Sequence, residues 1–177
     1  MEEWRDVRDH AGYSVSNYGR VRNDDTGWIL TMLRNQRGIL NVGLMENGVQ
    51  IKRSVARLVA IAFVPRPLSQ IETFDTPIHL DGDQNNACAL NLMWRPRWYA
   101  YRYHRQFRVE SEITPGPVRD LETKEIYEDL WIPVIRYGIL YMEIVLSAAN
   151  RTVVWPTMQR FEWVEMADIN PRQNRGI

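Results

Sequence analysis

Alternation of apolar and polar residues over short runs dominates the first third of the chain. Such period-two runs are typical of half-buried antiparallel strands, and turn residues separate them here. The pair Asn47-Gly48, which lies between apolar residues, is a strong signal for a tight hairpin. The pattern predicts strands at about residues 13–15, 20–23, 28–33, 39–45 and 49–53.

The spacing becomes helical after Ser54, where apolar residues recur every three or four positions until Pro65 stops the pattern. An irregular connector follows. Two short extended segments, 77–80 and 90–94, then flank a loop rich in turn residues. A helix is predicted from Pro96 to Phe107, since proline is tolerated in a first turn. This order predicts a compact strand, loop, strand and helix.

The last third of the chain begins after Thr114-Pro115-Gly116-Pro117, which reads as a linker or tight turn. Two strands are expected around residues 122–124, followed by a helix that Gly138 closes and a second helix over 140–151. A final strand is expected within 155–166. Two short helices joined near a glycine are typical of a helix-turn-helix, but also of helical hairpins in general.

The 22 basic and 22 acidic residues cancel, which argues against a protein that coats nucleic acid through a large positive charge. Charge is nevertheless segregated, because no acidic residue occurs from Ala87 to Arg108. Arginine is the main basic residue, which favours bidentate contacts to phosphate, base edges or carboxylates. This acid-free segment contains five arginines, Arg95, Arg97, Arg102, Arg105 and Arg108. Aromatic residues, among them Trp98, lie between them.

The single cysteine, Cys88, excludes an internal disulfide, and no paired Cys/His motif suggests structural zinc. The chain opens with acidic residues, and no apolar run approaches the length of a membrane span. We therefore expect a soluble cytoplasmic protein with no membrane partner.

Several short motifs follow one another between about Trp4 and Phe107: GYSVSNYGRVRN, SVARLVAIAFV, IHLDGDQNN and NLMW. In order and spacing they resemble the HNH homing endonucleases of phages, in which a β-rich nuclease-associated module precedes an HNH domain. The C-terminal part resembles, more weakly, the helix-turn-helix module of such enzymes. The resemblance implies an α+β protein with a β-rich module at 1–53, a ββα-metal (HNH) unit at 54–108 and a helix-turn-helix-like module at 117–166. It also implies a phage-encoded protein in a bacterial host cell.

An HNH unit holds one divalent cation, and a histidine on its first strand acts as general base toward water. By resemblance His79 takes the position of this base. Other motif residues match the loop and the second strand, where Asp and Asn side chains organise turns. These predicted loop residues are Asp81, Gly82, Asn85, Asn86 and Asn91.

The positions that hold the cation in the resembling family differ in this chain. One family ligand directly precedes the base histidine, and the other lies on the helix about six residues after the NLxW tryptophan. Here these positions are Ile78 and Ala100, whereas Mg²⁺ or Mn²⁺ requires oxygen ligands. The sequence predicts a degenerate metal site. Replacement ligands, if the enzyme is active, would come from Asp75, Asp81 and His104.

Three hypotheses follow. The first is a protein that has lost cleavage but binds double-stranded DNA through the basic and aromatic helix and its flanks. The predicted DNA contacts are Arg95, Arg97, Arg102, Arg105, Arg108 and Trp98. The second is an active endonuclease that nicks or cuts DNA with His79 as general base and Mg²⁺ or Mn²⁺ as cofactor. The third is an inherited fold that now binds a phage or host replication or transcription protein.

Overall fold

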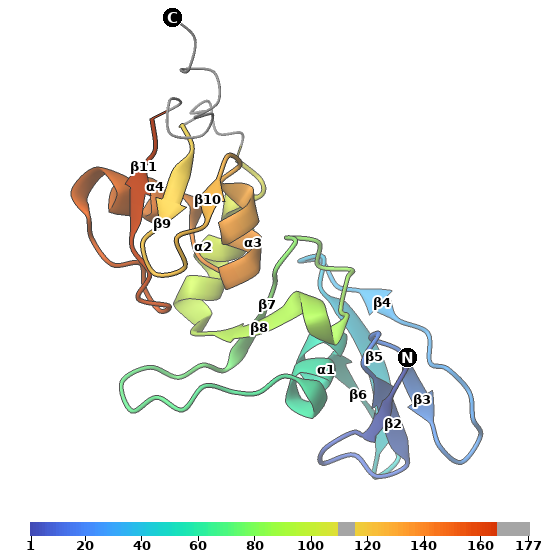
Figure 1. Ribbon diagram of the computed structural model, residues 1–177. Helices are drawn as coiled ribbons and strands as arrows, with labels where there is room; N and C mark the ends of the chain where they lie inside the picture. The colour runs from blue at the N-terminus through green and yellow to red at the C-terminus, as the bar shows by residue number, and fades with distance from the viewer. Residues whose placement is uncertain (110–115, 166–177) are drawn as a thin grey trace, which may run out of the picture. The chain divides into compact units, whose positions relative to one another are not determined.

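The computed structural model describes residues 1–109 and 116–165 (Figure 1). Part of the predicted linker, Thr114 and Pro115, and the last residue of the predicted third module lie outside the described residues. The chain divides into two compact units, Met1–His104 and Arg105–Ile177. The predicted modules 1–53 and 54–108 thus share one unit as far as His104, and the boundary between them stays a prediction.

Three short strands begin the first unit: β1 (Trp4–Asp6), β2 (Tyr13–Ser16) and β3 (Val21–Asn23), in the antiparallel order β1-β2-β3. Strand β1 was not predicted, because two of its three residues are charged. The predicted strand at 28–33 is wrong for most of its length. Residues 28–32 have a single isolated bridge, Arg22↔Ile29, and only Leu33 belongs to a strand, whereas Trp28 lies exposed to solvent instead of alternating into a core.

A second antiparallel sheet has the order β4-β5-β6, with β4 (Leu33–Arg34), β5 (Leu40–Glu46) and β6 (Val49–Ser54). The predicted hairpin is confirmed. Asn47 and Gly48 both have positive φ, at 51° and 80°, as the two central residues of a type I′ turn require. Alternate residues of β5 point inward, so that Val42 and Leu44 are buried.

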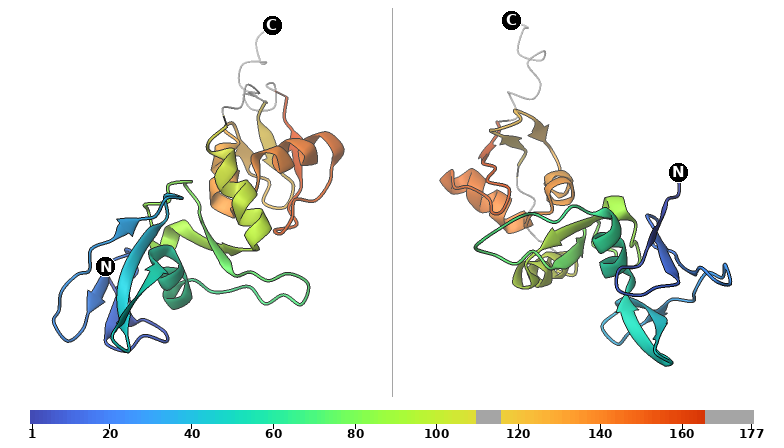
Figure 2. Two further views of the ribbon diagram at one scale, coloured as in Figure 1. Left: turned by 180° about the vertical axis from the view of Figure 1, so that it is seen from behind. Right: turned by 90° about the horizontal axis from the view of Figure 1, so that it is seen from below.

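Helix α1 (Val55–Phe63) links the two halves of the first unit. The Ser54 side chain caps it by accepting a hydrogen bond from the Arg57 backbone N–H. One face of the helix buries Val55 and Val59 completely. The helix contacts strands β2, β5 and β6 as well as the next pair of strands, β7 and β8 (Figures 1 and 2). It therefore forms part of a core that all of these strands share.

The predicted unit of a strand, a loop, a second strand and a helix is present. Strands β7 (Thr76–His79) and β8 (Leu92–Arg95) pair antiparallel, with His79 opposite Leu92. A single 3₁₀ turn, Ala89–Asn91, precedes β8, and α2 (Arg97–Gln106) follows it directly. The element boundaries differ from the predicted ones by one or two residues, which is common where helices and strands fray.

The second unit contains the sheet β10-β9-β11 and two helices. Its strands are β9 (Val118–Asp120), β10 (Ile126–Tyr127) and β11 (Phe161–Trp163), and its helices are α3 (Trp131–Tyr137) and α4 (Tyr141–Asn150). Gly138 ends α3 in a left-handed conformation, and the axes of the two helices differ by 110°.

Buried residues of the helices and of β11, among them Ile144 and Phe161, form the core of this unit. The chain thus has the mixed α and β fold that the sequence predicts, with small sheets and four α-helices among the described residues. No single helix in these residues is long and apolar enough to cross a membrane. Only the bent α3–α4 pair meets that criterion, by length and composition alone.

Candidate functional site

His79 lies at the end of β7 with only 5% of its surface exposed. Its Nδ1 is 3.3 Å from Nε2 of His104 on α2, and the same Nε2 accepts the His79 backbone N–H at 3.2 Å. Burial, followed by the neighbouring His104, lowers the pKa of His79 from its ordinary 6.5 to about 4. The imidazole is therefore neutral at pH 7, and it is a weak base, since general bases work best with a pKa near the working pH.

The two positions where the resembling family places metal ligands are apolar and buried. Ile78 is 0% exposed on β7, and Ala100 is 3% exposed on the inner face of α2. Its neighbours on that face, Tyr99 and Tyr103, are fully buried. Neither side chain has an oxygen atom, and the packing around both is that of a hydrophobic core.

The loop between β7 and β8 is organised by the Asp81 carboxylate. It accepts hydrogen bonds from the side-chain amides of Asn86 at 2.7 Å and Asn91 at 2.8 Å, and from the Asp83 backbone N–H at 2.9 Å. The Asn91 side-chain oxygen in turn accepts the Asp81 backbone N–H. With three donors on its carboxylate, Asp81 acts as a turn-organising residue.

Other residues of this loop also stabilise its turns. Asp83 accepts hydrogen bonds from the backbone and side chain of Asn85, and the backbone bond is the main cause of the lowered pKa of Asp83. Gly82 adopts a φ of 76°, which favours glycine.

The β7–β8 loop is also held to the N-terminal sheet. The Ala89 backbone N–H donates to the Asn17 carbonyl at 2.8 Å. Gly19, at a φ of 85°, comes so close that a Cβ there would lie 3.1 Å from that of Ala87. The SNYG turn and the HxDG loop therefore pack directly on each other.

The predicted replacement ligands do not assemble around His79. Asp75 precedes β7, at the opposite end of the strand from His79, and its carboxylate accepts the Thr76 hydroxyl at 2.9 Å. His104 contacts His79 directly, whereas the Asp81 carboxylate is engaged by donors of its own loop. Across residues 1–109 and 116–165, no three His, Cys, Asp or Glu side chains form a group that could hold a metal ion. The residues present do not fit a hard divalent cation.

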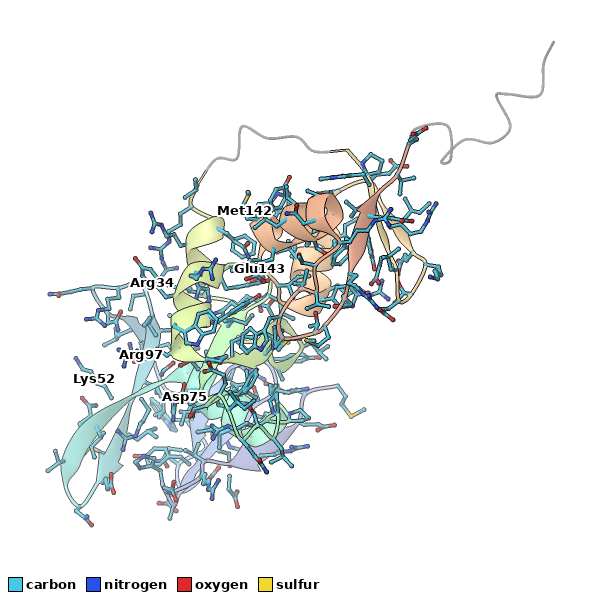
Figure 3. The ribbon with its side chains drawn as sticks, turned by 90° about the vertical axis from the view of Figure 1, so that its left-hand side faces the viewer. Arg34, Lys52, Asp75, Arg97, Met142 and Glu143 are labelled. Carbon is cyan, nitrogen blue, oxygen red and sulfur yellow. The ribbon has the colours of Figure 1, made fainter. Side chains whose placement is uncertain are left out.

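Helix α2 has two distinct faces. The inner face packs against the unit, and the Tyr103 hydroxyl donates to the Leu80 carbonyl at 2.8 Å, which anchors the helix near the end of β7. The opposite face is exposed to solvent and carries most of the predicted DNA contacts, of which Arg97 is labelled in Figure 3. Its exposed residues are Arg97, Trp98, Tyr101, Arg102 and Arg105, and Arg108 is exposed just beyond the helix end.

Arg95 differs from the prediction, which placed it among the DNA contacts. Its side chain is 4% exposed, and its guanidinium donates to the Trp94 carbonyl at 2.9 Å. The guanidinium also lies 5.9 Å from the centre of the Tyr99 ring. Burial lowers the pKa of Arg95. Because its side chain is buried and lies near the Tyr99 ring of α2, this arginine supports the packing of the helix and is not exposed for DNA binding.

One groove of mixed polar and apolar lining corresponds to none of the predicted sites. A hollow of about 290 Å³ lies over the sheet β4-β5-β6, and Arg34, Asn41, Gln50 and Lys52 contribute to its lining (Figure 3). Gln50 and Lys52 occupy alternate positions of β6, so the period-two pattern places both on one face of the sheet. That alternation was the available signal.

Comparisons with known proteins agree with the motifs. The model of the NUMOD4 motif matches residues 2–45. An uncharacterized HNH endonuclease of Acanthamoeba polyphaga mimivirus is 29% identical over 94 residues, which are 53% of this chain and 27% of that protein. The chain thus spans about a quarter of the length of this curated relative.

A solved structure described as "DNA binding and cleavage by the HNH homing endonuclease I-HmuI" shares the fold. It matches with a TM-score of 0.51 and 19% identity, over 92% of this chain and 98% of that one. Together with the motif order, these matches support the description of the chain as an HNH homing endonuclease-like protein with a NUMOD4 motif in its first 45 residues.

Proposed function

We propose that this chain binds double-stranded DNA and does not cleave it. The observation that carries the proposal is a contrast within one ββα unit. The outer face of α2 keeps its exposed arginines, whereas Ile78 and Ala100 fill the expected ligand positions with buried apolar side chains. In this proposal the protein is phage-encoded and acts in the cytoplasm of a bacterial host.

Loss of cleavage follows from electrostatics. Phosphodiester hydrolysis requires charge stabilisation at the phosphate and its leaving oxygen, which a cation supplies in metal-dependent nucleases. His79 alone provides a neutral imidazole whose lowered pKa makes it a poor proton acceptor. A base without that charge stabilisation accelerates hydrolysis little, so DNA should be held without being cut.

DNA binding is supported by the chemistry of the α2 face. Arg97, Arg102, Arg105 and Arg108 can each make bidentate contacts to phosphate oxygens, and Trp98 offers a half-exposed aromatic surface beside them. In the second unit, the 110° angle between α3 and α4 and the short turn at Gly138 support a helix-turn-helix-like role in a groove.

Titration of labelled duplex DNA at low and moderate salt tests binding. We expect affinity to fall as salt rises, and a triple variant with Arg97, Arg102 and Arg105 changed to Gln to bind more weakly with a shallower salt dependence. A matched control changes Arg20, Arg119 and Arg136 to Gln, because these arginines are already paired with carboxylates. No binding at low salt, or equal losses in both triples, contradicts the proposal.

Incubation with supercoiled plasmid and Mg²⁺ or Mn²⁺ tests the absence of cleavage. We expect the plasmid to stay supercoiled with the natural sequence, as it should with His79→Ala. Conversion to nicked circles by the natural sequence, lost in His79→Ala, would instead establish the alternative of an active endonuclease with His79 as base.

A second candidate function, binding of a phage or host replication or transcription protein, is favoured by the surface of α3 and α4. Helix α4 contains no Lys or Arg. Exposed apolar side chains on the two helices are Ile132, Ile135, Met142 and Leu146. Exposed apolar surface suits a protein partner better than a phosphate backbone. Co-purification with such a protein, in a sample that shows no DNA binding at low salt, would favour this candidate.

A further inference from the structure

Three arginines from separate parts of the first unit line a hollow of about 380 Å³ beside α1. Arg8 follows β1, Arg57 lies in the first turn of α1, and Arg66 follows the end of that helix. Val64 and Trp94 contribute an apolar floor. None of the motifs used to infer DNA binding includes these three arginines together.

Two of the three guanidinium groups are held in place by their neighbours. Arg57 donates through Nη1 to the Asp75 carbonyl at 2.7 Å, which engages one of its five N–H donors. The guanidinium carbon of Arg66 lies 4.3 Å from the centre of the Trp94 ring. A ligand that met these groups would therefore immobilise little additional side chain, which favours binding.

The floor beneath Arg66 is rigid as well. Trp94 is almost completely buried, and its ring N–H donates to the Val64 carbonyl at 2.9 Å. This bond joins β8 to the residue that ends α1. The cation–π partner of Arg66 is thus itself fixed in the core.

The charge of the hollow differs sharply from that of the whole chain. Three guanidinium groups and one carboxylate, that of Asp9, line the hollow, whereas the chain as a whole has a net charge of zero. Within the described ranges 1–109 and 116–165, no ion pair links Arg8, Arg57 or Arg66 to a carboxylate. Like charges brought together in one concave surface repel each other and concentrate anions there.

We propose that this hollow is a binding site for a phosphate group. The planar guanidinium presents paired N–H donors whose spacing matches phosphate oxygens. The surplus of two positive charges suits a doubly charged phosphate better than a single carboxylate. The phosphate can come from the backbone of duplex DNA, in which case the inference rests on the proposed function, or from a free phosphate compound, in which case it does not.

Calorimetric titration of the intact protein with pyrophosphate tests the site without DNA. We expect binding that weakens about tenfold or more when Arg8, Arg57 and Arg66 are all changed to Gln. The α2 triple variant, with Arg97, Arg102 and Arg105 changed to Gln, removes the same charge and should bind pyrophosphate within about twofold of the natural sequence. Because Arg57 contacts the connector, the single variant Arg8→Gln serves as a second test in a protein that keeps that contact.

Duplex DNA titrated against salt distinguishes the two sources. For a backbone phosphate in the hollow, the slope of log affinity against log salt should become shallower by about 0.9 in the Arg8, Arg57 and Arg66 variant. A weaker pyrophosphate complex with an unchanged DNA slope assigns the site to a free phosphate compound. Undetectable pyrophosphate binding together with an unchanged slope, or equal loss of pyrophosphate binding in both triple variants, overturns the proposal.

Discussion

The imidazole of His79 lies against the imidazole of His104, and His79 is buried. The His79 Nε2 atom is buried and has no hydrogen-bond partner among the described residues, and its Nδ1 faces His104. Removal from water penalises the charged form of His79, and a protonated His104 adds repulsion. The free energy of unfolding should therefore depend on pH through this residue.

The sign of that dependence follows from the pKa values. The pKa of His79 in the folded protein, about 4, is below its ordinary value of 6.5, so the unfolded chain binds a proton first as the pH falls. The stability from neutral His79 is complete above about pH 6.5 and decreases down to about pH 4, by about 3 kcal/mol in all. Denaturant unfolding at several pH values measures it. The variant His79→Asn should show a weaker pH dependence over this range, and equal dependence would contradict the prediction.

Asp81 allows a second prediction at this scale. Its carboxylate accepts the amides of Asn86 and Asn91 and the backbone N–H of Asp83, so Asp81→Ala removes the shared acceptor of the loop. We expect a loss of about 1–3 kcal/mol in the free energy of unfolding. Asp25→Ala, at an exposed turn position, should stay within about 0.5 kcal/mol. Equal effects of the two substitutions in denaturant titrations would show that the Asp81 bonds contribute no net stability.

Single residues also show what sequence can and cannot predict. The prediction of a degenerate metal site rests on the identities of Ile78 and Ala100, whose apolar side chains have no donor atoms, and it stays a prediction. Arg95 was misassigned, because its neighbours in sequence are basic and aromatic like those of the exposed arginines. Its burial is a property of the folded chain that local sequence does not reveal.

Among the elements, those with strong local signals were predicted well. The β5–β6 hairpin carries Asn-Gly at its turn, and α1 carries a serine cap and helical spacing. Strand β1 was not predicted, and the segment 28–33 was predicted wrongly for most of its length, since pairing with neighbouring strands decides their conformation more than propensity does. The same dependence on context explains why the phosphate hollow, which combines three distant segments, had no sequence signal.

The α3–α4 turn gives a prediction at the scale of elements. Gly138 has a φ of 60° and ψ of 43°, and its N–H donates to the Val134 carbonyl. A side chain in this left-handed conformation is strained, so Gly138→Ala should lower the free energy of unfolding by about 1–2 kcal/mol. Gly116→Ala is the matched control, because a Cβ there meets no atom within 4 Å. Thermal or denaturant unfolding should separate the two variants, and equal stability would contradict the strain argument.

Over the whole molecule, zero net charge conceals a strong local segregation of charge. The acid-free segment from Ala87 to Arg108 and the hollow beside α1 are both basic, whereas other arginines are paired with carboxylates, as Arg119 is with Glu162. Binding to a polyanion should then depend on the number of phosphates contacted locally and not on net charge.

That expectation can be measured. If the four exposed arginines of the α2 face each contact one phosphate, log affinity for duplex DNA should fall with log salt at a slope of about −3 to −4. Contacts from the hollow or from the second unit would make the slope steeper. A slope near zero would show that the α2 face does not meet the DNA backbone.

The contact between the SNYG turn and the HxDG loop has an evolutionary consequence. Ala89 donates a backbone hydrogen bond to Asn17, and the absence of a side chain at Gly19 leaves room for Ala87. Genetic exchange that replaced one of these segments without the other would separate surfaces shaped to fit each other. We therefore expect the SNYG turn and the HxDG loop to be inherited together, even in proteins that are no longer selected for cutting DNA.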